Sequence, residues 1–175
     1  MTATISRDLE IRPPRSHDAR AMAELMATGN STYREWAPRL WHPPGVQRTR
    51  SQWHLRLREE DRWSRVAIGR DGALVGLASW RPAREHGEEG PIISGVAYVS
   101  HVYVHPDLWG NGIATGLLAL ADAAMREAAC TRAILWTPTD APARRFYERC
   151  GWRLDGRERW SAELRLPMVG YQKHL

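Results

Sequence analysis

A long β-forming run leads through a glycine-containing loop into an apolar helix, and this segment constrains the fold more than any other. Residues Ile92 to His105 are rich in Val, Ile and Tyr, and Pro106 ends the run. Residues Ile113 to Ala129 carry a broad apolar stripe at helical spacing. The segment therefore predicts a strand followed directly by a helix that buries one face, as in a mixed α/β domain.

Shorter elements are expected on both sides of this segment. Hydrophobic periodicity and turn residues predict strands at Leu9–Arg12, Ser64–Arg70, Ala73–Trp80 and Ala133–Thr137, and helices at Asp18–Ala27, Gln47–Glu60 and Ala141–Cys150. Residues 31–50 read as irregular, and Arg81–Pro91 reads as a polar loop. Two further strands are expected within Trp152 to His174, joined by a turn at Asp155-Gly156.

The length and composition fit one domain that spans residues 1–175. The chain is 43% hydrophobic, which is too apolar for a disordered protein. No apolar run reaches the roughly 18 residues that a membrane span needs, and the first residues do not resemble a secretory signal. The two cysteines, Cys130 and Cys150, follow no metal-ligand spacing. We therefore expect a cytoplasmic protein with no metal and no membrane partner.

The positive charge of the chain is spread along its length. The formal net charge is +5, but residues 1–90 hold 15 basic and 12 acidic residues, and the arginines do not cluster. This pattern lacks the basic arm that follows a nucleic-acid backbone, so we expect no nucleic-acid partner and keep that function as an alternative only. A mildly positive field favours a small polyanionic ligand.

The loop between the central strand and helix has the features of an anion site. Gly110 and Gly112 let the backbone approach a ligand closely, and the first N–H groups of the following helix lack partners within it. Together with the helix dipole they suit a pyrophosphate, although a plain strand-to-helix turn would use glycine in the same way. A P-loop is excluded because the one lysine is Lys173, and Thr115 stands where the dinucleotide fingerprint needs glycine.

Two motifs resemble the GNAT superfamily of acetyl-CoA-dependent N-acetyltransferases. The strand V-Y-V (102–104) and loop W-G-N-G-I-A (109–114) resemble the signature [R/Q]-x-x-G-x-[G/A], with Trp109 in place of the usual Arg or Gln. The segment T-D-A-P-A-R-R-F-Y-E-R-C-G-W (139–152) resembles the helix N-x-x-A-x-x-F-Y-E-x-x-G-F/W, with Asp140 in place of Asn. The resemblance covers roughly residues 60–175, and both motifs occur in the family's order.

The resemblance implies a fold, a co-substrate and an activity. The implied fold is a central, mostly antiparallel, twisted sheet of six or seven strands flanked by about four helices. The implied activity is transfer of the acetyl group of acetyl-CoA to a primary amine, by direct attack and without a metal, in a protein that is often a homodimer. The cofactor-binding residues would be Val102, Tyr103, Val104, Trp109, Gly110, Asn111, Gly112, Ile113, Ala114, Thr115, Asp140 and Tyr147.

The resemblance also implies catalytic roles. Tyr147 lies where the family places the hydroxyl that protonates the leaving thiolate, although it could simply pack beside its aromatic neighbours. His101 and Ser100 are candidates for the base or for ordering a water, with Tyr98 and Glu35 as further candidates. Regular strand alternation would place His101 and Tyr98 on opposite faces of the sheet.

The acceptor is expected to bind through residues 28–60 and 81–91. Tyr33, Trp36, Trp41 and His42 suggest an aromatic-walled pocket, or else a cover for the edge of the core. Glu85, Glu88 and Glu89 suggest attraction of a cationic amine, or else a solvated acidic loop. A small-molecule amine is the favoured acceptor. A protein N-terminus and a non-catalytic acyl-CoA-binding or sensing module, suggested by Trp109 and Asp140, remain alternatives.

Overall fold

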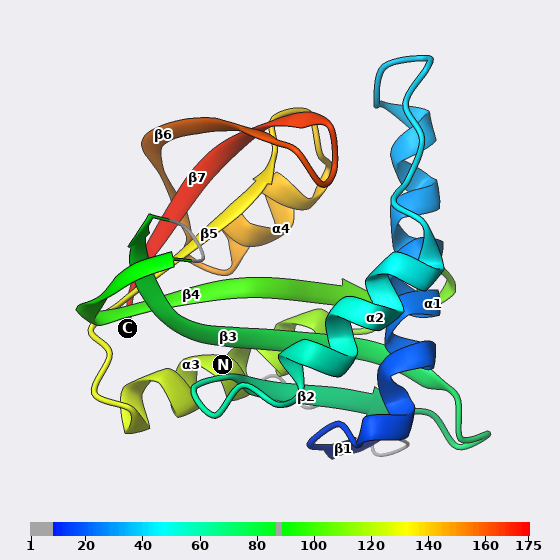
Figure 1. Cartoon of the computed structure of the whole chain (residues 1–175), viewed down its shortest axis with the longest axis horizontal. Coiled ribbons are helices and arrows are strands. Elements are labelled where there is room, and N and C mark those ends of the chain that lie inside the picture. The colour runs from blue at the N-terminus through cyan, green and yellow to red at the C-terminus, as the bar shows by residue number, and fades with distance from the viewer. Residues whose placement is uncertain (1–8, 87–88) are drawn as a thin grey trace.

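A computed structural model describes residues 9–86 and 89–175, which form one seven-stranded sheet in the order β1-β2-β3-β4-β5-β7-β6 (Figure 1). The strands are β1 (Glu10–Arg12), β2 (Trp63–Ile68), β3 (Leu74–His86), β4 (Glu89–Val104), β5 (Arg132–Pro138), β6 (Arg153–Ser161) and β7 (Leu166–His174). The helices are α1 (Ala19–Ser31), α2 (Val46–Arg56), α3 (Ile113–Glu127) and α4 (Ala143–Arg149), with short 3-10 helices η1 (Ser16–Asp18), η2 (Thr32–Glu35) and η3 (Pro106–Leu108). The mixed α/β fold with a mostly antiparallel sheet is confirmed.

Helices cover both faces of the sheet. On one face α1 and α2 bury Met22, Met26 and Trp53 against Val66 and Leu77 of β2 and β3. On the other face the apolar stripe of α3 packs against β3, β4 and β5 through side chains such as Leu117, Leu118 and Met125. Figure 1 shows α1 and α2 in front of the sheet and α3 behind it. The predicted central helix therefore buries the face that its periodicity defines.

The sheet opens between β4 and β5, which form its parallel pair. Pairing between these strands runs from Val96↔Arg132 to Val99↔Leu135. Beyond Val99, β4 continues along β3 alone, whereas β5 continues along β7. Figure 1 shows the two strands diverging towards the side where α1 lies. A wedge-shaped opening thus forms in the middle of the sheet, and backbone groups on its two edges face it.

Two sequence expectations about turns are wrong. Arg81–Pro91 is not a loop: β3 runs to His86 and β4 starts at Glu89, because Arg84 still pairs with Ile92 across two register shifts. Asp155-Gly156 is not the C-terminal hairpin turn either. It forms a bulge within β6, where Gly156 has a φ of +81° and the register shifts between Leu154 and Glu158. The chain reverses instead over residues 162–165.

Among the described residues, no helix is long and apolar enough to cross a membrane.

Candidate active site

A β-bulge at Ser100 changes which side chains of β4 share a face. Ser79 of β3 pairs with His101 and the next residue, Trp80, pairs with Val99, so Ser100 is the extra residue. Val99 and Val102 both pack on the α3 side, whereas the His101 ring lies against Trp53 of α2, with ring centroids 4.8 Å apart. The expectation from regular alternation is therefore wrong: the bulge brings His101 to the face that Tyr98 occupies.

The main chain of β4 presents two N–H groups to the wedge. The His105 N–H donates to the Val75 carbonyl of β3 at 2.9 Å. Because alternate residues of an antiparallel strand point in opposite directions, the N–H groups of Val102 and Val104 point away from β3, towards the side that β5 has left. The Trp109 indole N–H donates to the Val104 carbonyl at 2.9 Å. Trp109 thus ties the glycine loop to the strand instead of offering a charged side chain.

The loop that follows forms an open cradle at the start of α3. Gly110 and Gly112 have φ angles of +83° and +76°, which L-residues with side chains rarely adopt. No side chain caps the helix at Gly112, so the N–H groups of Ile113, Ala114 and Thr115 point outward without helical partners. A Cβ atom at either glycine would meet nothing within 4 Å. The geometry therefore fits the pyrophosphate that the loop glycines and the start of the helix predict here.

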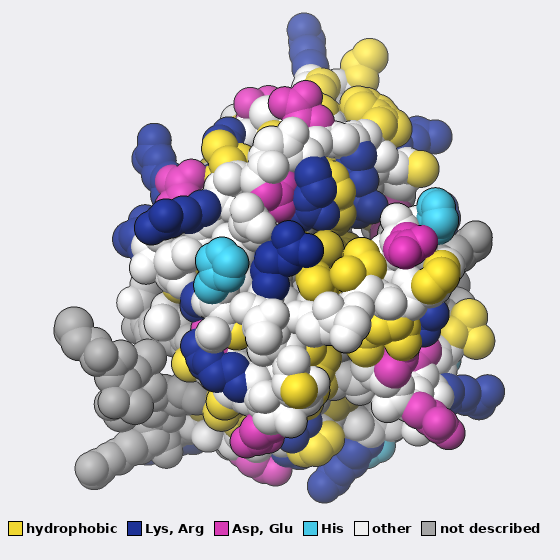
Figure 2. Space-filling model, turned by 90° about the vertical axis from the view of Figure 1, so that its left-hand side faces the viewer, with side chains coloured by type: hydrophobic (Ala, Val, Ile, Leu, Met, Phe, Trp, Pro, Cys, Tyr) yellow, Lys and Arg dark blue, Asp and Glu magenta, His cyan; other side chains and the backbone are white. Residues whose placement is uncertain are grey.

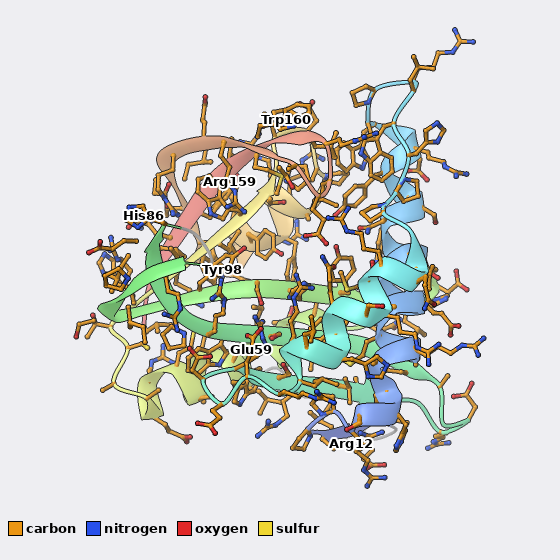
Figure 3. All side chains as sticks on the ribbon, in the orientation of Figure 1. Arg12, Glu59, His86, Tyr98, Arg159 and Trp160 are labelled. Carbon is orange, nitrogen blue, oxygen red and sulfur yellow. The ribbon has the colours of Figure 1, made fainter. Side chains whose placement is uncertain are left out.

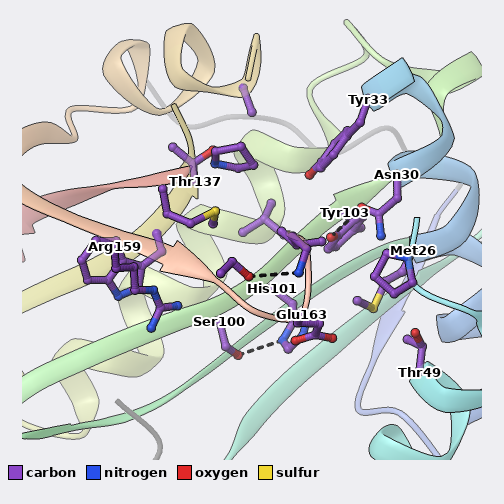
Figure 4. Close-up of a pocket in the computed structure, with 18 of the residues that line it drawn as sticks. Met26, Asn30, Tyr33, Thr49, Ser100, His101, Tyr103, Thr137, Arg159 and Glu163 are labelled. Atoms are coloured by element: carbon purple, nitrogen blue, oxygen red, sulfur yellow. Dashed lines mark hydrogen bonds between the residues drawn. The ribbon is translucent and has the colours of Figure 1, made fainter. Parts of the chain in front are cut away.

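A cavity of about 150 Å³, the transfer chamber, lies in the wedge. The predicted site residues that line it are Tyr98, Ser100, His101, Val102, Tyr103 and Tyr147, and they are joined by Asn30, Tyr33, Trp136, Arg159 and Glu163. Figure 4 shows Arg159 and Glu163 on the β6 side of the chamber and Asn30 and Tyr33 on the α1 side. Asp140 is exposed in the turn before α4 and does not line the chamber.

Tyr147 packs beside an aromatic neighbour and also faces the transfer chamber, so both sequence-based interpretations of its position apply. Its ring packs edge-on to Trp152, with centroids 6.3 Å apart, and also lines the transfer chamber. Burial raises the pKa of the Tyr147 phenol well above its usual value, and nearby ionisable groups such as Tyr33 raise it further. The hydroxyl therefore keeps its proton at neutral pH, which is the state a general acid needs.

The His101 and Ser100 side chains are held in a hydrogen-bonded network. His101 Nε2 lies 3.4 Å from Arg56 Nη1, so it accepts from the guanidinium, and Nδ1 then carries the proton that faces Ser100 Oγ at 2.9 Å. Ser100 Oγ also accepts from Arg62 at 3.0 Å and donates to the Ser79 carbonyl at 3.2 Å. Burial and the nearby arginines hold the pKa of His101 well below its usual value, so the ring is neutral.

The structure adds residues that sequence reasoning missed. The Tyr103 hydroxyl donates to Asn30 Oδ1 at 3.0 Å. Glu163 reaches the transfer chamber from the connection between β6 and β7, and no described residue forms a hydrogen bond or ion pair with its carboxylate. No local pattern in the sequence marks Asn30 or Glu163, because each reaches the chamber only through the tertiary fold. A register or turn prediction alone could not have found them.

The predicted acceptor-side aromatic residues separate into two groups. Tyr33 lines the chamber, as an aromatic wall would. Trp41 is buried, and its indole N–H donates to the Leu164 carbonyl at 2.6 Å, so it covers the core edge and fixes the β6–β7 connection. His42 and Glu35 are exposed and do not line the chamber. Glu88 and the side chain of Glu89 lie outside what the structure describes, whereas Glu85 is exposed.

Within residues 9–86 and 89–175, no three His, Cys, Asp or Glu side chains gather in a group that could hold a metal ion.

Comparisons with known proteins point to one family and one fold. The model of the acetyltransferase (GNAT) family matches residues 27–152, whereas no curated protein matches the chain. The PaiA N-acetyltransferase from Thermoplasma acidophilum, solved in complex with coenzyme A, is similar with a TM-score of 0.72 and 17% identity over 95% of this chain and 99% of that one.

Two other similar structures carry acceptor names. A spermidine N-acetyltransferase SpeG chimera from Vibrio cholerae and hSSAT has a TM-score of 0.67 and 17% identity, over 95% of each chain. The ribosomal-protein-alanine N-acetyltransferase from Brucella melitensis has a TM-score of 0.67 and 22% identity, over 95% of this chain and 99% of that one. At these identities the likeness shows the fold, and the named acceptors differ from one another.

Proposed function

We infer that this chain, which belongs to the acetyltransferase (GNAT) family, catalyses transfer of the acetyl group of acetyl-CoA to a primary amine of a small molecule. The family match covers most of the chain, and one continuous segment contributes to both sites, because the second half of β4 lines the transfer chamber and the start of α3 forms the open cradle. The proposal assigns acetyl-CoA as co-substrate.

The residues of the wedge suit acetyl-CoA, which supplies an acetyl group activated as a thioester. The outward N–H groups of Ile113, Ala114 and Thr115 would bind the pyrophosphate at the start of α3. The N–H groups of Val102 and Val104 would hold the extended arm and polarise the acetyl carbonyl as negative charge develops on its oxygen. Asp140, also expected to bind the cofactor, is exposed in the turn before α4 and is not among the residues that line the chamber.

In the proposed reaction, the neutral amine nitrogen bonds to the carbonyl carbon, the carbon–sulfur bond breaks, and the amine gives up one proton, which passes to solvent directly or through a base. Tyr147 donates its phenolic proton to the departing sulfur and regains one from solvent afterwards. The base role expected for His101 or Ser100 stays a prediction. For His101 to act as the base, Arg56 would have to release Nε2, because that nitrogen already accepts a hydrogen bond from the guanidinium. Positioning both substrates in the chamber supplies much of the rate gain.

The observation that carries the proposal is the position of Tyr147, a protonated phenol in the chamber where β4 and β5 separate. The first test is calorimetric titration with acetyl-CoA, with NAD and ATP as controls, followed by release of free thiol in the presence of an amine panel. Selective binding of acetyl-CoA with amine-dependent thiol release is expected. Binding without release for any amine or peptide would instead indicate an acyl-CoA-binding module, and no binding would overturn the proposal.

A further inference from the structure

An open groove continues from the transfer chamber along the face that α2 covers. Its volume is about 960 Å³, and it is termed the acceptor groove below. The chamber and the groove share seven lining residues, so they form one continuous space: Tyr98, Ser100, His101, Trp136, Arg159, Ser161 and Glu163. Figure 3 shows Arg159 and Trp160 on β6 above Tyr98 of β4. A substrate whose amine enters the chamber would therefore extend its remaining part into the groove.

The acceptor groove carries more positive than negative side chains. Six arginines line it, namely Arg48, Arg56, Arg84, Arg132, Arg157 and Arg159, together with three acids, Glu85, Asp155 and Glu163. Figure 2 shows several Lys and Arg side chains in the upper half of the face, where β6 and β7 lie in Figure 1, with Asp and Glu side chains among them and further basic side chains in the lower half. Asp155 neutralises Arg157, and Asp61 neutralises Arg84 at 3.0 Å. Among the described residues, no carboxylate forms an ion pair with the other four arginines.

Arg159 is held at the border between the chamber and the groove. Its guanidinium carbon lies 4.5 Å from the centre of the Trp136 ring, and that of Arg157 lies 4.6 Å from the same ring. Gly170 of β7, the strand between β5 and β6, leaves room for Arg157 to reach the ring, because a Cβ atom at Gly170 would come within 3.0 Å of the Arg157 side chain. A guanidinium stacked on a ring keeps its in-plane N–H donors free for a carboxylate or phosphate.

Arg56 presents a second partly buried charge from α2. Two neutral groups contact it: His101 Nε2 lies 3.4 Å from Nη1, and the Trp53 ring centre lies 5.6 Å from the guanidinium carbon. One turn earlier, Gln52 also lines the acceptor groove, and its buried Oε1 has no hydrogen-bond partner among the described residues. A buried acceptor atom without a partner is costly, so Oε1 marks a place where an N–H or O–H group of a ligand, and not its anionic oxygens, would be stabilised.

We propose that the acceptor carries an anionic group, a carboxylate or a phosphate, in addition to its primary amine. Arg159 and Arg56 bind the anionic group in the acceptor groove, and the unpaired carboxylate of Glu163 receives the amine at the entrance to the transfer chamber. A polyamine would instead place its second cation among arginines that have no counter-ion. The inference rests on the proposed function and names the substrate class of the same site.

The test compares matched pairs of amines by free-thiol release and, separately, by calorimetric binding. Amino acids are paired with their carboxamides, aminoalkyl phosphates are paired with the parent amino alcohols, and spermidine represents a polycation. We expect the anionic member of at least one pair to have a kcat/KM about 10-fold to 100-fold above its neutral partner, the range for charge-assisted hydrogen bonds. The carboxylate and phosphate pairs distinguish the two sources of the charge.

Variants then connect the preference to the groove. Arg159→Gln and Arg56→Gln should each lower the anionic-to-neutral ratio of kcat/KM about 10-fold. Arg153→Gln, at an exposed position of β6 outside the groove, should leave the ratio unchanged. A preference for spermidine, or arginine variants that retain the ratio, would overturn the inference. If no amine at all is acetylated, the proposed function fails, and calorimetry with the same pairs still decides whether the groove prefers the anion.

Discussion

The two sides of the wedge are built in different ways. The proposed cofactor side consists of main-chain groups from one continuous segment, the end of β4, the glycine loop and the start of α3. The acceptor side is built from side chains of separate regions: α1 with η2, α2, the β4 bulge, β5, and β6 with its connection to β7. Backbone geometry follows from short motifs, whereas the acceptor side exists only after distant elements have packed. Substitutions on the cofactor side should therefore change acetyl-CoA binding, and substitutions on the acceptor side should change acceptor binding.

The largest expected effect comes from a charge placed in the cradle. Gly112→Glu should weaken acetyl-CoA binding at least about 100-fold, because its carboxylate would repel the phosphates and its Cβ would disfavour the left-handed backbone at φ +76°. Isothermal calorimetry measures this effect directly. The proposed acceptor side is untouched by the substitution, so binding of an acceptor amine should persist.

Gly112→Ala is the control that separates charge from backbone strain. It introduces the same steric restriction without the charge, at a position where a Cβ would meet nothing within 4 Å. The free energy of acetyl-CoA binding should therefore fall by a smaller amount, about 1 to 2 kcal/mol. Equal losses for the two variants would show that the loop conformation matters and that no phosphate lies over it.

Tyr147→Phe should slow acetyl transfer without weakening the binding of acetyl-CoA. The ring packing against Trp152 is retained, so acetyl-CoA affinity should stay close to wild type, whereas kcat should fall about 100-fold or more through loss of the acid. Rapid-mixing measurements of thiol release would separate chemistry from product release. An unchanged kcat would show that another group or water protonates the sulfur.

The same contrast explains which features the sequence predicts. The central strand, the glycine loop and α3 follow from Pro106, the two loop glycines and a helical apolar stripe, which act over neighbouring residues. The bulge at Ser100 carries no such mark, because it arises from how β3 and β4 fit together. Glu163 lies far along the chain from Asn30, and only the packing of β6–β7 beside α1 brings both to one chamber.

Gly170→Ala should disturb the acceptor side through its packing. A Cβ there would lie 2.5 Å from Asp155 Oδ1 and 3.0 Å from Arg157 Cβ. The Asp155–Arg157 ion pair must therefore shift, and with it the Arg157 guanidinium that stacks on Trp136. Overpacking of this kind lowers the free energy of unfolding by about 1 to 3 kcal/mol. Urea denaturation measures the loss, and the KM of the acceptor should rise while acetyl-CoA affinity holds.

Gly45→Ala provides the matched control for Gly170→Ala. Gly45 has an ordinary negative φ of −68°, and a Cβ there would meet nothing within 4 Å. Its substitution should change the free energy of unfolding by less than about 0.5 kcal/mol. Similar losses at both glycines would mean that the close approach at Gly170 does not hold Arg157 in place.

The last expected effect is a difference in acid sensitivity between the two sides. The folded protein holds the pKa of His101 below the value of about 6.5 in an unfolded chain, so the unfolded state binds more protons as the pH falls below 6.5. The resulting loss of stability approaches about 1.4 kcal/mol per pH unit until the folded pKa is reached. His101→Gln removes this titration, so the free energy of unfolding measured by urea denaturation should change less between pH 7.0 and 5.5 in the variant than in the wild type.

Because the cradle is made of backbone N–H groups that do not titrate, acetyl-CoA affinity of the folded protein should vary less across this range than acceptor binding. An identical pH dependence of stability in the two proteins would mean that His101 is solvated enough to titrate normally in the folded protein.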